Sequence, residues 1–205
     1  MESISILLDG YRNFKAGASS QQSELYATLG TGQSPDVMVI GCADSRVEPA
    51  EIFNTQPGQI FVVRNVANLV HPSGSSDIAH SVASAVEFAV TALKVKHIVV
   101  LGHAGCGGVN ACLSAGNDKP IGEFIAPWVQ ALDATRDRVL ADNPEDPQTT
   151  LEHAGVATSI ANLMTYSFVK DAIASGDLEL HGAWFKIGDR ELYWQDKSDG
   201  TFRPV

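Results

Sequence analysis

The chain has 205 residues, of which 44% are hydrophobic and 19% charged, as is ordinary for a globular protein with a large core. Its formal net charge of −10 argues against nucleic acid and anionic membranes as partners, because both are bound by basic faces. The sequence has neither a basic leader nor an apolar run long enough to span a membrane. Three cysteines are too few for a disulfide framework, so we expect a reducing, cytoplasmic location.

The first thirty residues carry two predicted helices. Apolar residues recur there at helical spacing: Ile4, Leu7, Leu8, Tyr11 and Phe14. This stripe predicts a helix over residues 4–14, and a second helix is expected over 20–29. In a compact monomer such helices would cover their own sheet; the pattern alone does not decide which surface they cover.

Strands and helices then alternate along the chain. Short apolar runs rich in β-branched residues predict buried strands over 37–41, 60–63 and 98–101. Between them we expect a helical turn over 50–53, a helix capped by Ser76 or Asp77 with Ile78 on its inner face, and a small-residue helix over 108–114.

The C-terminal half predicts helices over 123–140 and 149–174, followed by strands over 178–187 and 192–194. No repeat, low-complexity tract or linker interrupts this order. The fold class is therefore α/β. It has a mainly parallel central sheet of four strands, a C-terminal antiparallel edge strand and flanking helices, all in a single domain over 1–205.

Potential metal ligands follow two of the predicted strands. Cys42 comes directly after one strand and its glycine, and His103 comes directly after another. Cys106 lies three residues further on, in a glycine-rich turn. Because parallel strands open at the same edge of a sheet, we expect the three side chains to converge. Two thiolates and one imidazole with a free fourth position are typical of a catalytic zinc site.

Asp44 and Arg46 lie beside the first cysteine, and their types suggest a hydrogen-bonded pair. The motifs Cys42-x-Asp44-x-Arg46 and His103-x-x-Cys106 closely resemble those of the β-class carbonic anhydrases, from about residue 11 to the C-terminal strand. The resemblance implies a β-carbonic anhydrase-like fold and one Zn²⁺ per chain. It also implies reversible hydration of carbon dioxide to bicarbonate and a proton by zinc-bound hydroxide, with Asp44 accepting a hydrogen bond from that hydroxide.

The resemblance also implies substrate contacts and partners. Gln33, in the motif Gly-Gln-Ser-Pro, is typical of the plant-type, open-site branch, where it donates its amide to a substrate oxygen. Phe61 matches an apolar pocket residue supplied across a dimer interface, and Phe88 stands where that branch often has a tyrosine. Gly107, after Cys106, is a fourth substrate-binding candidate. A homodimer or dimer-based tetramer follows, with residues 1–30 on the partner subunit.

Inhibition by bicarbonate is not expected to be cooperative. In one regulated branch of the family, a tryptophan, an arginine and a tyrosine form a bicarbonate pocket that moves the counterpart of Asp44 onto the metal. Only Arg64 matches that pocket here, since Val39 and Phe185 replace the two aromatic donors. We therefore expect Asp44 to stay paired with Arg46, and sigmoidal inhibition by bicarbonate would contradict this.

Activity should rise with pH into the alkaline range. A zinc ion with two thiolates is formally neutral, so it should acidify a water molecule less than zinc on three histidines, for which the pKa is about 7. A flat profile of kcat/KM between about pH 6 and pH 9 would contradict this expectation.

Several alternatives remain at this point. The two cysteines could be buried thiols, or Cys112 could close a structural zinc site, although its place inside a helix favours core packing. A carbonyl sulfide or carbon disulfide hydrolase could use the same ligands. A nucleotide-binding module, a cysteine phosphatase and a regulatory zinc protein fit the motifs less well. His71 and His80 are possible proton carriers but more simply surface residues.

Overall fold

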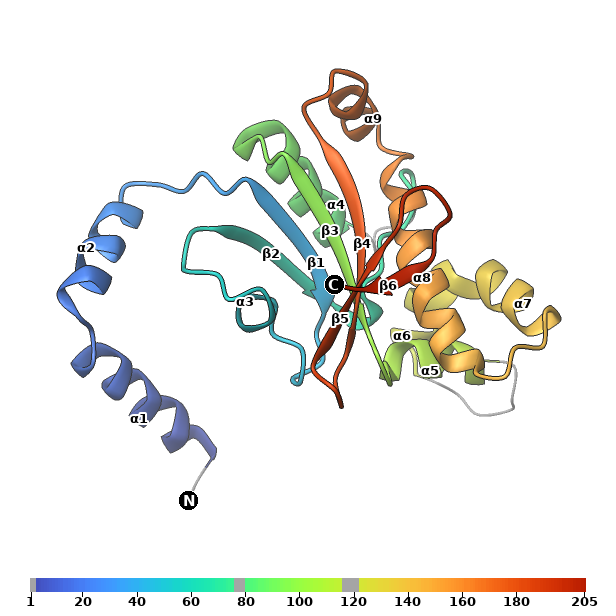
Figure 1. The fold of residues 1–205 in the computed structure, drawn as a ribbon, viewed down its shortest axis with the longest axis horizontal. Helices are drawn as coiled ribbons and strands as arrows, with labels where there is room; N and C mark the ends of the chain where they lie inside the picture. The colour runs from blue at the N-terminus through green and yellow to red at the C-terminus, as the bar shows by residue number, and fades with distance from the viewer. Residues whose placement is uncertain (1–2, 76–79, 116–121) are drawn as a thin grey trace. The chain divides into compact units, whose positions relative to one another are not determined.

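The computed structural model describes residues 3–75, 80–115 and 122–205, and the chain divides into two compact units, Met1–Gln33 and Ser34–Val205. The first unit contains α1 (Ser3–Ala16) and α2 (Ser20–Leu29), as predicted (Figure 1). Ser19 caps α2, because its hydroxyl accepts from the backbone N–H of Gln22 while the Gln22 side chain accepts from the backbone N–H of Ser19. The predicted stripe of α1 is exposed, at 52–67% of each side chain.

The second unit is built on one six-stranded sheet in the order β2-β1-β3-β4-β5-β6. Its strands are β1 (Val37–Cys42), β2 (Ile60–Asn65), β3 (His97–His103), β4 (Glu179–Lys186), β5 (Glu191–Gln195) and β6 (Phe202–Pro204). The first four in spatial order are parallel, and β5 and β6 are antiparallel to their neighbours. The predicted fold class is confirmed, with one addition: β6, not β5, is the C-terminal edge strand.

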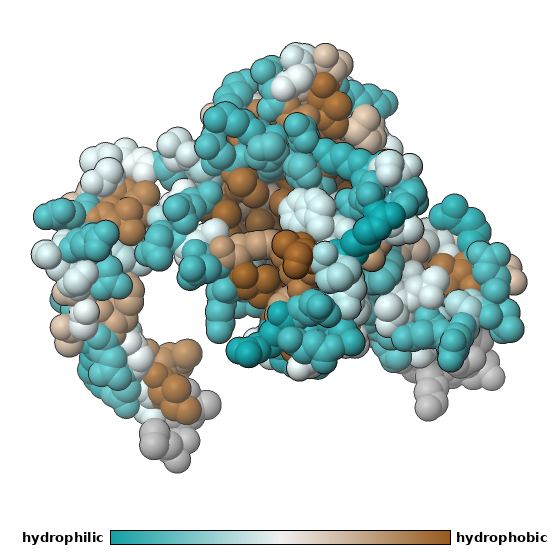
Figure 2. All heavy atoms as spheres, viewed as in Figure 1, coloured by the Kyte–Doolittle hydropathy of each residue, from teal (hydrophilic) through white to brown (hydrophobic). Residues whose placement is uncertain are grey.

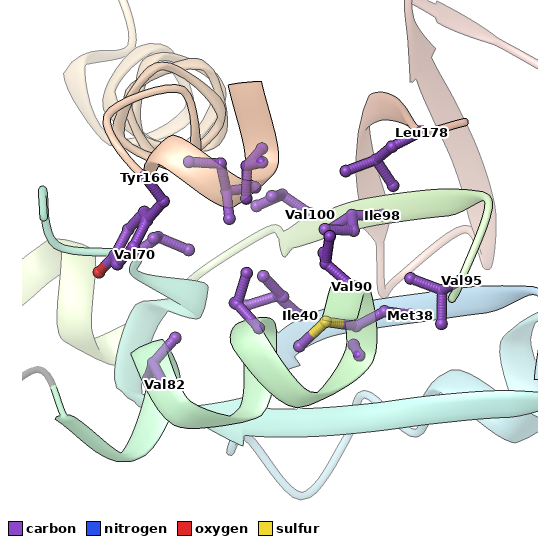
Figure 3. Close-up of a cluster of buried hydrophobic side chains, with 14 of the residues drawn as sticks. Met38, Ile40, Val70, Val82, Val90, Val95, Ile98, Val100, Tyr166 and Leu178 are labelled. Atoms are coloured by element: carbon purple, nitrogen blue, oxygen red, sulfur yellow. The ribbon is translucent and has the colours of Figure 1, made fainter. Parts of the chain in front are cut away.

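One face of the sheet packs against three helices, α4 (His80–Glu87), α8 (Pro147–Leu163) and α9 (Ser167–Ala174). Met38 and Ile40 of β1 and Ile98 of β3 point into this layer and are fully buried (Figure 3). The other face carries Val39, Val99 and Leu101 and packs against the short helix α3 (Pro49–Ile52). β1 is thus buried on both faces, as expected for a central parallel strand.

Smaller elements connect the strands and the longer helices of this unit. The 3₁₀ turn Val66–Asn68 follows β2, and the π-helical turn Phe88–Leu93 continues α4. The helices α5 (Gly107–Ser114), α6 (Ile125–Val129) and α7 (Asp133–Ala141) form a further layer with α8. The predicted cap at Ser76 or Asp77, with Ile78, lies outside the described residues.

The helix predicted over 149–174 is two helices, so this prediction is wrong in one respect. The chain leaves helical geometry after α8, and Tyr166 adopts an extended conformation before α9 begins. This break turns the Tyr166 ring into the core, where its hydroxyl donates to the carbonyl of His71 at 2.9 Å. The helix predicted over 123–140 is likewise divided. Its first part, α6, begins at Ile125, and the 3₁₀ turn Gln130–Leu132 separates it from α7. Among the described residues, no helix is long and apolar enough to cross a membrane.

Candidate metal centre

Cys42 and His103 are the last residues of two neighbouring parallel strands. β1 and β3 are paired in parallel, with Val37 opposite His97, so both strands end at the same edge of the sheet. Cys106 follows one turn later and caps α5. Gly105 lies between the two ligand candidates of this turn with a φ of 65°, a left-handed conformation that favours glycine. The turn therefore brings Cys106 back towards the strand ends.

The three side chains converge as the sequence predicts. The ligand atoms of Cys42, His103 and Cys106 all lie within 4.8 Å of one another, and the two sulfur atoms are 3.9 Å apart. Tetrahedral zinc with bonds of about 2.3 Å to sulfur requires a separation of about 3.8 Å. All three residues are buried, at 5% exposure or less. The donor set and its spacing therefore fit a zinc ion.

The imidazole of His103 offers one nitrogen to such an ion. Its Nδ1–H donates to the carbonyl oxygen of Ala104 at 3.0 Å, which fixes the tautomer that leaves a lone pair on Nε2. Nε2 is buried and has no hydrogen-bond partner among the described residues. An orphaned buried nitrogen is costly unless it binds something, so this atom is suited to a metal ion.

The thiols of Cys42 and Cys106 lie within hydrogen-bonding distance of each other, at 3.9 Å. A hydrogen bond from Cys106 lowers the pKa of Cys42 to about 4, and the same hydrogen bond raises the pKa of Cys106. Burial opposes the ionisation of both groups. Cys42 therefore loses its proton more readily than Cys106, and a bound divalent cation would favour the ionisation of both thiols.

Asp44 and Arg46 form a bidentate pair next to this cluster. The Arg46 Nε and one terminal nitrogen donate to the two carboxylate oxygens of Asp44 at 2.9 and 2.6 Å, and the backbone N–H of Arg46 donates at 2.9 Å. The guanidinium holds the pKa of Asp44 well below its usual range. Asp44 Oδ2 lies 3.9 Å from His103 Nε2, so an ionised carboxylate stands beside the ligand cluster.

Arg64 fixes the backbone around Asp44. Its guanidinium donates to the carbonyls of Cys42, Asp44 and Val47 at 2.7–2.9 Å, and to the Glu48 carboxylate at 2.6 Å. Four of its five N–H groups are thereby used. The arginine that matches the family's bicarbonate pocket thus serves here as a brace for the loop after β1. The absence of cooperative bicarbonate inhibition stays a prediction.

Glu152 of α8 supports Cys106, a contact that sequence reasoning missed. Its carboxylate is 2% exposed and accepts from the Cys106 backbone N–H at 2.9 Å, from Gln148 Nε2 at 2.7 Å and from Trp184 Nε1 at 3.1 Å. Gln148 also donates to the Cys106 carbonyl at 3.1 Å. Both peptide groups of Cys106 are therefore held by α8. The sequence carries a signal for this contact, because Glu152 is a charged residue in the apolar stripe of a predicted helix that also contains Val156.

The four predicted substrate-binding residues differ in their distance from the metal centre. Phe61 is opposite Met38, four residues before Cys42 and so about 13 Å along the strands from the centre of the same chain. Its ring contacts that of Phe88, with centroids 6.0 Å apart. Gly107 directly follows Cys106 as the first residue of α5. Gln33 ends the first unit, so its contact with substrate stays a prediction.

Three other residues can now be assigned. The prediction that His71 is a surface residue is wrong: it is 8% exposed, its Nε2 contacts the carbonyl of Trp128 at 2.9 Å, and burial lowers its pKa. A tilted contact with the Trp128 ring, with centroids 4.5 Å apart, helps to bury this loop histidine. Cys112 is fully buried in the cluster between α5, α6 and α7, as expected for a packing residue, and His80 is exposed.

Comparisons with known proteins agree with this geometry. A family model described as carbonic anhydrase matches residues 37–192. The mitochondrial β carbonic anhydrase 6 of Arabidopsis thaliana is 37% identical over 197 residues, covering 93% of this chain and 67% of the relative. The structure of the β-carbonic anhydrase CcaA superimposes with a TM-score of 0.93 at 30% identity, covering 98% of this chain and 99% of the other.

A tetrameric β-carbonic anhydrase of Sordaria macrospora superimposes with a TM-score of 0.83 at 30% identity, over 99% of this chain and all of the other. The matched family region contains the strand ends that carry Cys42, His103 and Cys106. Because sequence, fold and the Cys-His-Cys group agree over nearly the whole length, the chain belongs to the β-class carbonic anhydrases, which are zinc enzymes.

Proposed function

We propose that this chain catalyses the reversible hydration of carbon dioxide to bicarbonate and a proton with one zinc ion per chain. The observation that carries the proposal is the convergence of Cys42, His103 and Cys106 beside the Asp44–Arg46 pair. When bound, zinc would supply a hydroxide nucleophile by lowering the pKa of a water molecule. Cys42, His103 and Cys106 would hold the ion as two thiolates and one neutral imidazole.

Asp44 and Arg46 orient the attacking water. Two carboxylate oxygens of Asp44 are engaged by Arg46, so the carboxylate is ionised and is an acceptor only. Asp44 accepts a hydrogen bond from the water that attacks carbon dioxide, which directs a lone pair of that water towards the substrate carbon. Arg46 keeps Asp44 in this position, because the guanidinium also donates to the carbonyl of Gly105 at 3.3 Å.

Substrate contacts are proposed for four further residues. Gln33 donates its amide to a substrate oxygen, and Gly107 contacts the substrate through its backbone. Phe61 and Phe88 lie together at the amino half of β2, too far from the metal centre of their own chain. They therefore serve the centre of a partner subunit, where an apolar surface suits a small nonpolar substrate.

Replacing Gln33 with alanine should weaken kcat/KM by about tenfold, as for a lost neutral hydrogen bond of about 1–2 kcal/mol. Zinc content should not change, because Gln33 is not a ligand. Stopped-flow kinetics with zinc analysis measures both quantities. The matched control is Gln22→Ala, which removes a glutamine from the cap of α2 in the same unit. Equal kinetics for the Gln33 variant and the wild type would remove Gln33 from the site.

A homodimer or a dimer-based tetramer is the proposed assembly, and a solved relative is described as tetrameric. The apolar stripe of α1 is exposed in its own unit (Figure 2), and we propose that a second copy covers it, so that 1–205 acts as one domain in the assembly. Analytical ultracentrifugation of the full chain and of a chain lacking residues 1–30 tests this. The cytoplasmic location stays a proposal, which cell fractionation would test.

The experiment that tests the proposed reaction is a direct comparison of substrates. The zinc-loaded protein is assayed with carbon dioxide, carbonyl sulfide and carbon disulfide under the same conditions. Carbon dioxide hydration should exceed hydrolysis of both sulfur compounds. Turnover of a sulfur compound without hydration of carbon dioxide would instead support the hydrolase alternative, which the comparisons do not favour.

A further inference from the structure

A second group of ligand-type side chains lies at the opposite end of the sheet. His97 is the first residue of β3 and Glu179 the first of β4, and the two are opposite each other in the parallel register. His181 is two residues further along β4, so its side chain is on the same face as Glu179. His103 lies six residues along β3 from His97, about 20 Å away. The group is therefore separate from the metal centre.

The spacing of the two histidines matches that of two ligands of one ion. His97 Nδ1 and His181 Nε2 are 3.2 Å apart, and the Glu179 carboxylate is 3.9 Å from His181 Nε2. All three ligand atoms lie within 4.8 Å of one another. Tetrahedral zinc with bonds of about 2.05 Å to nitrogen requires two nitrogens about 3.3 Å apart. Metal binding would replace the hydrogen bond between the two histidines, and the Glu179 carboxylate, on a side chain that is 59% exposed, would move closer.

The surroundings hold the histidines in place and leave the carboxylate accessible. His97 and His181 line a pocket of about 410 Å³ whose other walls include Val39, Val99 and Trp194. Figure 2 shows apolar side chains gathered over the sheet on the viewed face of this unit. The Trp194 ring packs against His181 with centroids 5.5 Å apart. Rigid imidazoles reached from solvent are typical of metal ligands, because little ordering is needed on binding.

One neighbouring charge opposes a cation. Lys197 Nζ donates to Glu179 Oε2 at 2.8 Å and thus occupies the oxygen nearest to His181. This side chain is 58% exposed, so the ammonium can leave for solvent at little cost. An ion bound by the two histidines would therefore compete with Lys197 for the carboxylate, and the site should bind metal more tightly without the lysine.

We propose that His97, His181 and Glu179 bind a second divalent transition-metal ion, of which Zn²⁺ is the probe used here. Two imidazoles and a carboxylate suit zinc and its neighbours better than calcium or magnesium, which prefer all-oxygen sites. Such an ion would join the first residues of β3 and β4. The assignment does not depend on the reaction at the cysteine centre.

The test is zinc stoichiometry and affinity of the full chain. Protein already loaded at the cysteine centre is dialysed against a series of free Zn²⁺ concentrations, and bound zinc is measured by atomic emission. The wild type should take up two ions per chain and His181→Ala only one. His80→Ala, which removes an exposed histidine, should still bind two. Glu179→Gln should weaken the second ion by about tenfold or more, and Lys197→Met should tighten it.

Two results would overturn the proposal. One is a wild type that saturates at one zinc per chain. His97 and His181 would then form a hydrogen-bonded pair and no metal site. The other is a second zinc whose affinity is the same in Glu179→Gln and Lys197→Met as in the wild type, since that ion would be bound elsewhere. Both of these side chains are exposed, so neither change threatens folding, and unchanged carbon dioxide hydration checks that the chain is intact.

Discussion

Replacing Cys42, His103 or Cys106 with alanine should remove zinc and carbon dioxide hydration together. Each change leaves two of the three buried ligands, and two ligands should hold zinc much more weakly than three. Without the ion the nucleophile is not generated at neutral pH, and kcat/KM should fall by a factor of about 10³ or more. Zinc analysis and stopped-flow kinetics measure both effects.

Cys112→Ala is the matched control for these variants. Cys112 is also a fully buried cysteine, but it lies on the side of α5 that faces α7. Its sulfur is 4.0 Å from a carboxylate oxygen of Asp133. Its replacement should cost about 1 kcal/mol of stability and leave the zinc in place. Retention of one zinc per chain after loss of Cys42, His103 or Cys106 would contradict the ligand assignment.

Replacing Glu152 with alanine should weaken zinc binding although Glu152 is not a ligand. The change leaves two buried donors without their acceptor, the Cys106 backbone N–H and Trp184 Nε1, whereas Gln148 Nε2 keeps its bond to the Cys106 carbonyl. Each unsatisfied donor costs about 1–3 kcal/mol, so the free energy of unfolding should fall by about 2 kcal/mol or more. The turn that carries Cys106 loses its anchor, and zinc affinity should fall by about 10–100-fold.

Two further variants separate support of the ligand from general loss of stability. Trp184→Phe removes one donor to Glu152 but keeps the bond to Cys106, so it should lower stability without changing zinc affinity. Glu152→Gln retains an acceptor oxygen and should lie between the alanine variant and the wild type. Chelator competition measures zinc affinity, and urea unfolding measures stability. A Glu152→Ala protein that binds zinc as tightly as the wild type would show that α8 does not position Cys106.

The metal centre could be predicted from sequence because each ligand candidate lies at or just after the end of an apolar run. Cys42 and His103 complete β1 and β3, and parallel strands in register place their last residues side by side. Asp44 and Arg46 are two residues apart, so their pairing is local as well. Local sequence therefore carries most of the geometry of this site.

Contacts between distant segments could not be predicted in the same way. Glu152 reaches Cys106 across 46 residues, and this contact depends on how α8 packs against the sheet. The burial of His71 depends on Trp128, 57 residues away. The break at Tyr166 carries no glycine or proline, so helical periodicity alone joined α8 to α9. β6 was missed because it has only three residues and ends in Pro204.

Stopped-flow hydration of carbon dioxide by the full chain tests the central claim most directly. The protein is compared after zinc loading, after removal of zinc by a chelator, and after zinc is restored, with zinc content measured each time. We predict hydration far above the buffer rate for the loaded protein, loss of this activity without zinc and recovery with it. A folded protein with one zinc per chain that hydrates carbon dioxide no faster than buffer would contradict the account.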